Sequence, residues 1–485
     1  MKAYQDASLA PARRAKALLE EMTLAEKVGQ LNQRLYGFRI YERKCVNGED
    51  TIELSEEFRQ EVEKYSGLGV LYGLYRADPW ADKDYETGLT GVLSKKAYNQ
   101  VQRYVLEHSR LGIPVMMSSE CPHGHQALDG YLLPVNLLAG ATFDPAMVRA
   151  AYRVSGRQLQ NMGVDLALMS MLDVLRDPRW GRSEECYSED PYLSARMAEA
   201  AVIGMQESGP EVVAKHFAAQ GEGTGGVNAS AARIGERELR EIHFPPAAAA
   251  IKAGAKGIMA AYNEIDGVYC HANRWLLNDI IRKEMGFDGI VMSDGVAIDQ
   301  LDSMTGDNVV SGALALQSGV DVGLWDEAFG KLEEAVRRGL VKEAQIDQAV
   351  LRVLTLKFER GLFEHPYLEE EGEIHMDYAQ NPESVQLARE GLVILQNKNR
   401  VLPFWENQAS GKKIAVVGPN ADDLYNQLGD YTPPLRRDDG ITVLDGMKMI
   451  FKESDIRFSQ GCYLRKRDEN LLKEAVDTVK NSDIV

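Results

Sequence analysis

The sequence predicts an α/β protein, with a (β/α)8 TIM-like barrel followed by an incomplete α/β sandwich domain. From about residue 65 to 330, short apolar runs alternate with stretches of helical periodicity. Parallel strands need crossover connections, which are usually helices, so this alternation indicates a parallel sheet. Seven or eight such units occur, and that number favours a closed barrel. An open, doubly wound sheet is the alternative.

Each expected strand is a short apolar run that ends in polar residues. These runs lie at 68–72, 113–117, 164–169, 212–217, 257–261, 289–293 and 320–324. The helical patterns between them include 146–162, 237–253 and 273–285, in which apolar residues recur every three or four positions. A further helical stretch, 331–360, is followed by Gly361, a residue type that often terminates a helix.

The pattern divides the chain into two domains. The barrel domain is predicted to span 1–362, and 363–384 is acidic and irregular, as expected of a linker. A partial second domain, 385–485, has expected strands at 392–395, 414–418 and 456–458 and a helix at 443–451. The last residues, 482–485, resemble the start of another strand. Because a sheet cut there would have an unpaired edge, we expect a fragment of a longer protein, truncated within the second domain.

The composition excludes several classes of function. The net charge of −18 disfavours binding to nucleic acid, whose phosphates would repel the chain. No apolar run is long enough to span a membrane, and the amino-terminal stretch has no apolar secretory core. Five scattered cysteines fit reduced thiols better than a disulfide framework. We therefore expect a cytoplasmic protein without membrane or nucleic-acid partners; a homo-oligomer is possible.

Polar side chains follow several of the predicted strands. Glu120 follows the second run, Lys215 and His216 lie in the fourth, Tyr262 follows the fifth and Asp294 follows the sixth. The carboxyl ends of parallel barrel strands meet at one face, where such side chains form a concave site. By itself, Asp294 would be read as a helix cap. The mixture of charged and aromatic groups instead indicates a site for a neutral, polyhydroxylated ligand.

Two other patterns are weaker. Cys121, His123 and His125 have a spacing that metal ligands also show, but no fourth ligand is nearby, and we expect no metal site. The glycine-rich stretch 221–226 lacks the Gly-Lys-Ser/Thr ending of a phosphate-binding loop, which favours a flexible loop.

Ordered motifs cover nearly the whole chain. They are MTLAEKVGQL at 22–31, RLGIPVMMSSECPHGH at 110–125, DVLRDPRWGRSEECYSEDPYL at 173–193, VAKHFAAQG at 213–221, AAYNEIDG at 260–267 and GFDGIVMSD at 286–294. Further on, GLVILQNKNRVLPF is followed by IAVVGPNA. Together they resemble glycoside hydrolase family 3, and RDPRWGR with SEDP is the most specific part of the resemblance.

The resemblance implies a role for each polar residue. Asp294 matches the catalytic nucleophile, and Tyr262 matches the aromatic residue beside it, placed to hydrogen-bond the nucleophile. The implied sugar-binding residues are Glu120, Lys215, His216 and Arg176, with Arg182 as the second candidate for the arginine. Asp173 is expected to orient the arginines. No cofactor is implied.

The implied activity is that of a retaining, exo-acting β-glycosidase that acts on oligosaccharides or aryl or alkyl β-glycosides. β-D-Glucosidase is the first expectation because it is the commoner activity in the family. β-D-Xylosidase is the alternative, because Glu120 stands where glucosidases commonly have Asp, and Gly295 stands where they commonly have Trp. Gly295 implies a pocket wall that is either more open or filled by another loop.

The acid/base of two-domain members is a Glu from the second domain, which the resemblance places beyond Val485. Asp430 is a further candidate for a residue that reaches the site. An alternative of another class is therefore a sugar-binding fragment without its proton donor.

Overall fold

The computed structural model describes residues 2–485, which form two compact units. The first contains residues 2–392 together with Tyr431–Pro433, and the second contains Val393–Asp430 and Pro434–Val485. The predicted linker, 363–384, lies within the first unit. The division between the units falls after Leu392.

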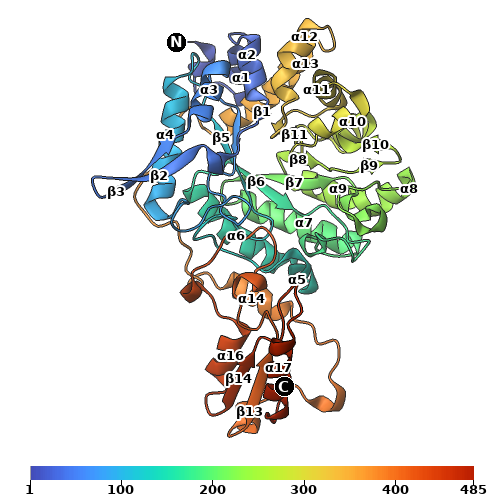
Figure 1. Cartoon of the computed structure of the whole chain (residues 1–485). Coiled ribbons are helices and arrows are strands. Elements are labelled where there is room, and N and C mark those ends of the chain that lie inside the picture. Colours follow the sequence, from blue (N-terminus) through green and yellow to red (C-terminus); the bar gives the residue numbers. More distant parts are fainter. Residues whose placement is uncertain (1) are drawn as a thin grey trace. The chain divides into compact units, whose positions relative to one another are not determined.

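The first unit is built on parallel strands (Figure 1). Six form one sheet in the order β11-β8-β7-β6-β5-β4. Their bounds are Ile290–Met292, Gly257–Ala260, Glu211–Phe217, Leu166–Ser170, Met116–Glu120 and Val70–Tyr72. Two more, β1 (Asn32–Gln33) and β12 (Gly323–Leu324), pair with each other. Parallel bridges from Tyr36 to Tyr72 and from Met292 to Val322 join this pair to the two sheet edges. The ring is thereby closed, so the predicted barrel is confirmed and the doubly wound alternative is wrong.

All seven predicted strand runs overlap a barrel strand, but β1 was not predicted. Its two residues, Asn32 and Gln33, are buried amides rather than apolar side chains. Asn32 donates to the carbonyl of Val28 at 2.6 Å, which satisfies its amide inside the barrel. The antiparallel hairpin of β2 (Tyr41–Val46) and β3 (Glu49–Leu54) was also not predicted.

Helices surround the strands of the first unit (Figure 1). Their bounds are α1 Pro11–Leu19, α2 Leu24–Gln30, α3 Glu56–Tyr65, α4 Gly91–Glu107, α5 Asn136–Ala141, α6 Pro145–Asn161, α7 Pro191–Gln206, α8 Glu236–Glu238, α9 Phe244–Lys252, α10 Asp302–Thr305, α11 Asn308–Ser318, α12 Leu332–Arg337, α13 Glu343–Glu359 and α14 Glu383–Glu390. The predicted helix 331–360 is two helices, because Gly339 adopts a φ of +70° between them. The stretches Leu239–His243 and Trp275–Glu284 are wider, π-type helices.

The second unit contains a parallel pair, β13 (Lys413–Val417) and β14 (Asp455–Ser459), with α15 (Glu406–Ala409), α16 (Val443–Ile450) and α17 (Glu469–Lys480). Ile484 bridges Ile414 in parallel, as expected for the start of another strand. The strand predicted at 392–395 is wrong. These residues pair with no strand among those described, and their side chains are exposed, up to 94% at Leu395.

None of the helices within residues 2–485 has both the length and the apolar character that crossing a bilayer requires.

Asp321, just before β12, ties the amino-terminal ends of two barrel strands together. Its carboxylate accepts from the Val291 N–H at 2.8 Å, from Arg282 at 2.6 Å and from Arg352 at 2.8 Å. We predict that Asp321→Asn lowers the free energy of unfolding by about 3 kcal/mol, because it leaves Arg282, whose side chain is only 11% exposed, without its anion. Urea unfolding followed by far-UV circular dichroism measures this loss. A decrease below about 0.5 kcal/mol, the size of an ordinary surface substitution, would contradict it.

Candidate active site

A pocket of about 290 Å³ opens at the carboxyl ends of the barrel strands, near the lower limit of about 300 Å³ for small-molecule sites. Its lining residues are Tyr72, Arg76, Trp80, Glu120, Arg182, Tyr262, Asp294, Leu324, Trp325 and Tyr431. Four of the seven predicted site residues are among them. The size and the polar lining suit a single small polar ligand.

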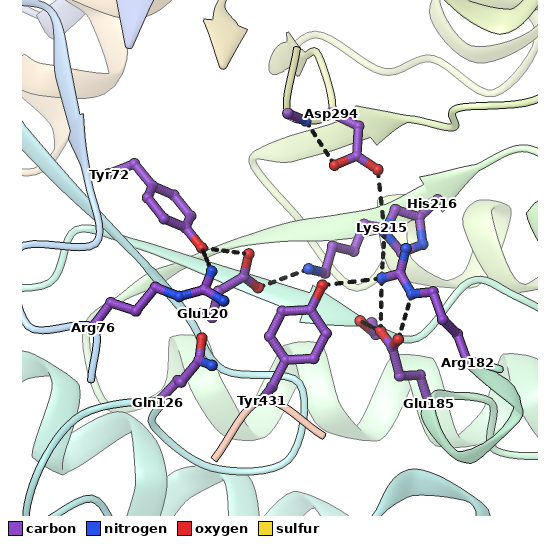
Figure 2. A network of polar contacts seen from close by, with 12 residues as sticks. Tyr72, Arg76, Glu120, Gln126, Arg182, Glu185, Lys215, His216, Asp294 and Tyr431 are labelled. Carbon is purple, nitrogen blue, oxygen red and sulfur yellow. Dashed lines mark hydrogen bonds and ion pairs between the residues drawn. The ribbon is translucent and has the colours of Figure 1, made fainter. Parts of the chain in front are cut away.

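A buried ion pair links two strands beneath the pocket (Figure 2). Glu120, the last residue of β5, accepts from the Lys215 ammonium of β7 at 2.7 Å. Its other oxygen accepts from the Tyr72 hydroxyl at 3.1 Å. Burial by itself would lower the pKa of Lys215, but the facing Glu120 carboxylate raises it above the ordinary value. The Lys215 ammonium is therefore held charged beneath the pocket, next to Glu120 in its lining.

Arg76 extends this network, although it was not predicted. It donates to the Tyr72 hydroxyl, and its guanidinium pairs with Asp78 at 2.8 Å. Gln126 donates to the same Asp78 carboxylate at 2.8 Å. The sequence did contain a signal for Arg76, because this residue follows the predicted strand 68–72, as other site residues follow theirs.

His216 is fixed by Asp173, whose carboxylate lies 2.7 Å from Nδ1. Nε2 of His216 lies 3.1 Å from Nη2 of Arg182. Because a guanidinium only donates, Nε2 must accept, which puts the ring proton on Nδ1 and directs it to Asp173. Asp173 was expected to orient the arginines. That expectation is wrong, because the Asp173 carboxylate contacts His216 instead.

Arg182, rather than Arg176, lies in the pocket. Its guanidinium pairs with Glu185 at 2.5 and 2.9 Å, and it donates to the Tyr431 hydroxyl at 3.2 Å. Arg176 was the first candidate for the sugar-binding arginine, and the structure contradicts this placement. Its half-exposed guanidinium pairs with Glu222 at 3.3 Å, away from the pocket lining.

Tyr431 is a second site residue that the sequence did not reveal. It belongs to the short segment Tyr431–Pro433 of the first unit. Its ring centroid lies 4.6 Å from the Lys215 ammonium, a cation–π distance (Figure 2). Nothing in the local pattern marks this residue, because it follows Asp430 in an irregular stretch far from the barrel strands. Asp430 itself belongs to the second unit.

Asp294 follows β11 and lines the pocket with an exposed fraction of 9%. Its N–H donates to Nε2 of His271 at 3.1 Å, and Oδ1 accepts from the Gly295 N–H at 2.8 Å. Burial lowers the pKa of His271 to about 4, which keeps Nε2 free to accept. Oδ2 has no hydrogen-bond partner among the described residues and lies 3.6 Å from His216 Nε2.

The hydroxyl of Tyr262 lies beside Asp294, whose carboxylate adds to the effect of burial in raising the Tyr262 pKa. It donates to the carbonyl of Gly295 at 2.9 Å, one residue further along. The expected aromatic neighbour is therefore present, but it holds the backbone of the turn.

The space beside Gly295 is filled by another loop. A Cβ atom on Gly295 would lie 2.6 Å from the ring of Trp325, which follows β12. Trp325 stacks on Tyr36 with centroids 4.6 Å apart and meets the edge of Tyr72 at 4.8 Å. Of the two alternatives for this wall, the structure shows the filled one.

The histidines of the 121–125 stretch have structural partners. His123 lies 3.0 Å from the carbonyl of Leu133, and His125 lies 2.8 Å from the Ser119 hydroxyl. Burial lowers the pKa of His125 to about 3. Across residues 2–485, no group of three or more His, Cys, Asp or Glu side chains is arranged to hold a metal ion.

Comparison with known proteins identifies the family. Residues 23–356 match the glycosyl hydrolase family 3 N-terminal domain, and residues 392–485 match the family 3 C-terminal domain. The chain belongs to glycosyl hydrolase family 3.

Relatives include both glucosidases and xylosidases. A β-xylosidase of Formosa agariphila is 32% identical over 84% of this chain, and a periplasmic β-glucosidase of Salmonella typhimurium is 30% identical over 96%. Among solved structures, a β-glucosidase of Erythrobacter marinus has a TM-score of 0.87 at 30% identity and covers 100% of this chain. The Listeria innocua β-glucosidase in complex with glucose has a TM-score of 0.82 at 28% identity and covers 98%.

The chain spans 61% of the length of both sequence relatives. It covers 66% of the Erythrobacter marinus chain and 63% of the Listeria innocua chain.

The pair between Arg182 and Glu185 predicts a pH-dependent stability. Burial would raise the pKa of Glu185, but Arg182 outweighs it and brings the pKa to about 2, below the ordinary value of 4.5. A lowered carboxyl pKa contributes stability above pH 4.5 that is lost as the pH falls toward 2. We predict that the gap in unfolding free energy between wild type and Glu185→Gln narrows by about 2 kcal/mol from pH 6 to pH 3. Urea unfolding at each pH measures it, and a constant gap would contradict the assignment.

Proposed function

We propose that the protein is a retaining, exo-acting β-glycosidase that uses Asp294 as its nucleophile. The observation that carries the proposal is the gathering of Asp294, Glu120 and Arg182 around one small pocket, with Lys215 and His216 beneath it. Charged groups at fixed positions bind hydroxyl groups more strongly than neutral ones do. A pocket of this volume takes one sugar ring, which supports release of single sugars from chain ends.

In this mechanism the Asp294 carboxylate attacks the anomeric carbon, and the bond from that carbon to the aglycone oxygen breaks. The resulting glycosyl ester is then hydrolysed by water, which restores Asp294 and releases the sugar with its configuration retained. Lys215, Arg182 and Glu120 hold the ring hydroxyls, and hydrogen bonds that strengthen as charge develops lower the barrier. His216, held by Asp173, is placed beside the nucleophile.

Departure of the aglycone also requires a proton donor. Glu120 is unsuited to that role, because its two oxygens already accept from Lys215 and Tyr72. We assign the acid/base to no residue that lines the pocket. The present chain is accordingly proposed to react with aryl glycosides whose leaving group needs no proton. A sugar-binding fragment that reacts with no glycoside is the alternative class.

The first candidate substrate is a β-D-glucoside. It is supported by the structural likeness to β-glucosidases, one of them bound to glucose. A β-D-xyloside is the second candidate, favoured by the length of Glu120. The extra methylene of Glu relative to Asp carries the carboxylate further into the pocket, toward the space that the hydroxymethyl group of a hexose would need.

Covalent trapping tests the nucleophile. We predict that a 2,4-dinitrophenyl 2-deoxy-2-fluoro-β-glucoside, or the corresponding xyloside, labels the peptide that contains Asp294. The activated leaving group departs without an acid, and the fluorine slows hydrolysis of the ester enough for it to accumulate. Peptide mass spectrometry locates the label, and Asp294→Asn is the control that should remain unlabelled. A label on another carboxylate, or none with either sugar, would overturn the proposal.

Shortening Glu120 tests the choice of sugar. We predict that Glu120→Asp shifts the ratio of kcat/KM for aryl glucoside over aryl xyloside toward the glucoside by about tenfold, since one methylene is worth roughly 10–200-fold in a pocket. Steady-state rates on paired dinitrophenyl glycosides measure it. Glu222→Asp is the matched control, because it removes the same methylene outside the pocket and should leave the ratio unchanged. An unaltered ratio in both variants would remove Glu120 as the determinant.

A further inference from the structure

Asp294 lies on a turn, residues 293–299, whose backbone is held from outside the turn itself. The Ser293 N–H donates to the carbonyl of Val322 and the Val296 N–H to that of Leu324, each at 2.8 Å. Both acceptors belong to the neighbouring β12 region. The N–H groups of Ile298 and Asp299 donate to a single carboxylate oxygen, Oδ1 of Asp326, at 2.8 and 3.2 Å. The position of the turn therefore depends on the segment that follows β12.

Asp326 joins both ends of this turn. Its second oxygen, Oδ2, accepts from the Ser293 hydroxyl at 2.6 Å and from the Leu324 N–H at 3.1 Å. The residue is 1% exposed and is absent from the pocket lining. Burial and the nearby Asp299 carboxylate raise the pKa of Asp326, to about 8, while the hydrogen bonds from Ser293, Ile298 and Asp299 act in the opposite direction.

The turn is strained where it is held. Val296 has a φ of +61°, a left-handed conformation that β-branched residues rarely adopt. Such backbone persists only when surrounding contacts determine it, and it occurs at functional sites. On the other side, the Trp325 ring lies against Gly295. The turn has contacts on both sides, and Asp326 supplies three of the polar ones.

We infer that Asp326 is a positioning residue that fixes the nucleophile by clamping the turn that carries it. This inference rests on the proposed role of Asp294 as nucleophile. Asp326 acts through Ser293, Ile298 and Asp299 without reaching the substrate. Its loss displaces the Asp294 carboxylate and leaves Glu120, Lys215 and Arg182, which come from other elements, in place.

Asp321 provides a matched comparison at the other end of β12. It too is buried and accepts from a backbone N–H and from charged side chains, but it has no contact with the turn. A purely structural role for Asp326 would make the two carboxylates equivalent in their effect on the reaction.

The test compares Asp326→Asn and Asp321→Asn in the full chain by the kinetics of trapping with the activated 2-fluoro glycoside. We expect Asp326→Asn to lower the maximal labelling rate about 100-fold, with the inhibition constant changed by less than about threefold, because a small displacement of reacting groups slows chemistry more than binding. Asp321→Asn should keep the labelling rate within about threefold of wild type even though its stability falls. Equal effects of the two variants on the labelling rate would overturn the inference.

A second variant covers the case in which Asp326→Asn does not fold, as judged by circular dichroism. Ser293→Ala removes one of the four donors to Asp326, together with the acceptor of the Leu324 N–H at 2.7 Å. It should lower the labelling rate about fivefold without changing the inhibition constant, in line with the loss of these neutral hydrogen bonds. An unchanged rate would again overturn the inference. Failure of the proposed function is distinguishable, because wild type would then carry no label on Asp294.

Discussion

The ion pair between Glu120 and Lys215 is the contact on which the pocket depends. Both groups are buried, and a single charge at that depth would be strongly disfavoured, so each requires the other. They stand on β5 and β7, the two strands that flank β6, and their contact at 2.7 Å links these strands. The pair fixes the Glu120 carboxylate in the pocket lining, with the Lys215 ammonium directly beneath it.

The other charges follow the same rule. Arg182 has Glu185, Arg76 has Asp78, and His216 has Asp173. Each carboxylate partner restricts the rotamers of the cationic side chain or histidine that it contacts, so these side chains are held in place before a ligand binds. Among residues 2–485, the Asp294 carboxylate has no such cationic partner at hydrogen-bond distance: Oδ2 lies 3.6 Å from His216 Nε2.

The sequence was informative where function coincides with the ends of apolar strands. The sequence placed Glu120, Lys215 and Asp294 together because the carboxyl ends of the barrel strands meet at one face. The strand β1 was not found, because two buried amides produce no apolar run. The arginine was ranked wrongly because Arg176 and Arg182 lie in one irregular loop, where spacing does not determine which side chain turns inward. Tyr431 was beyond prediction, since its place in the first unit depends on tertiary packing alone.

The turn that carries Asp294 shows why local rules fail at such a site. Val296 adopts a left-handed backbone conformation, which is unfavourable for a valine in an isolated turn. Gly295 lies so close to the Trp325 ring that a larger residue would not fit there. The turn keeps this conformation because β12 closes the barrel beside it and brings Leu324, Trp325 and Asp326 into contact with it. Closure of the ring through the short pair β1 and β12 is thus coupled to the geometry of the Asp294 carboxylate.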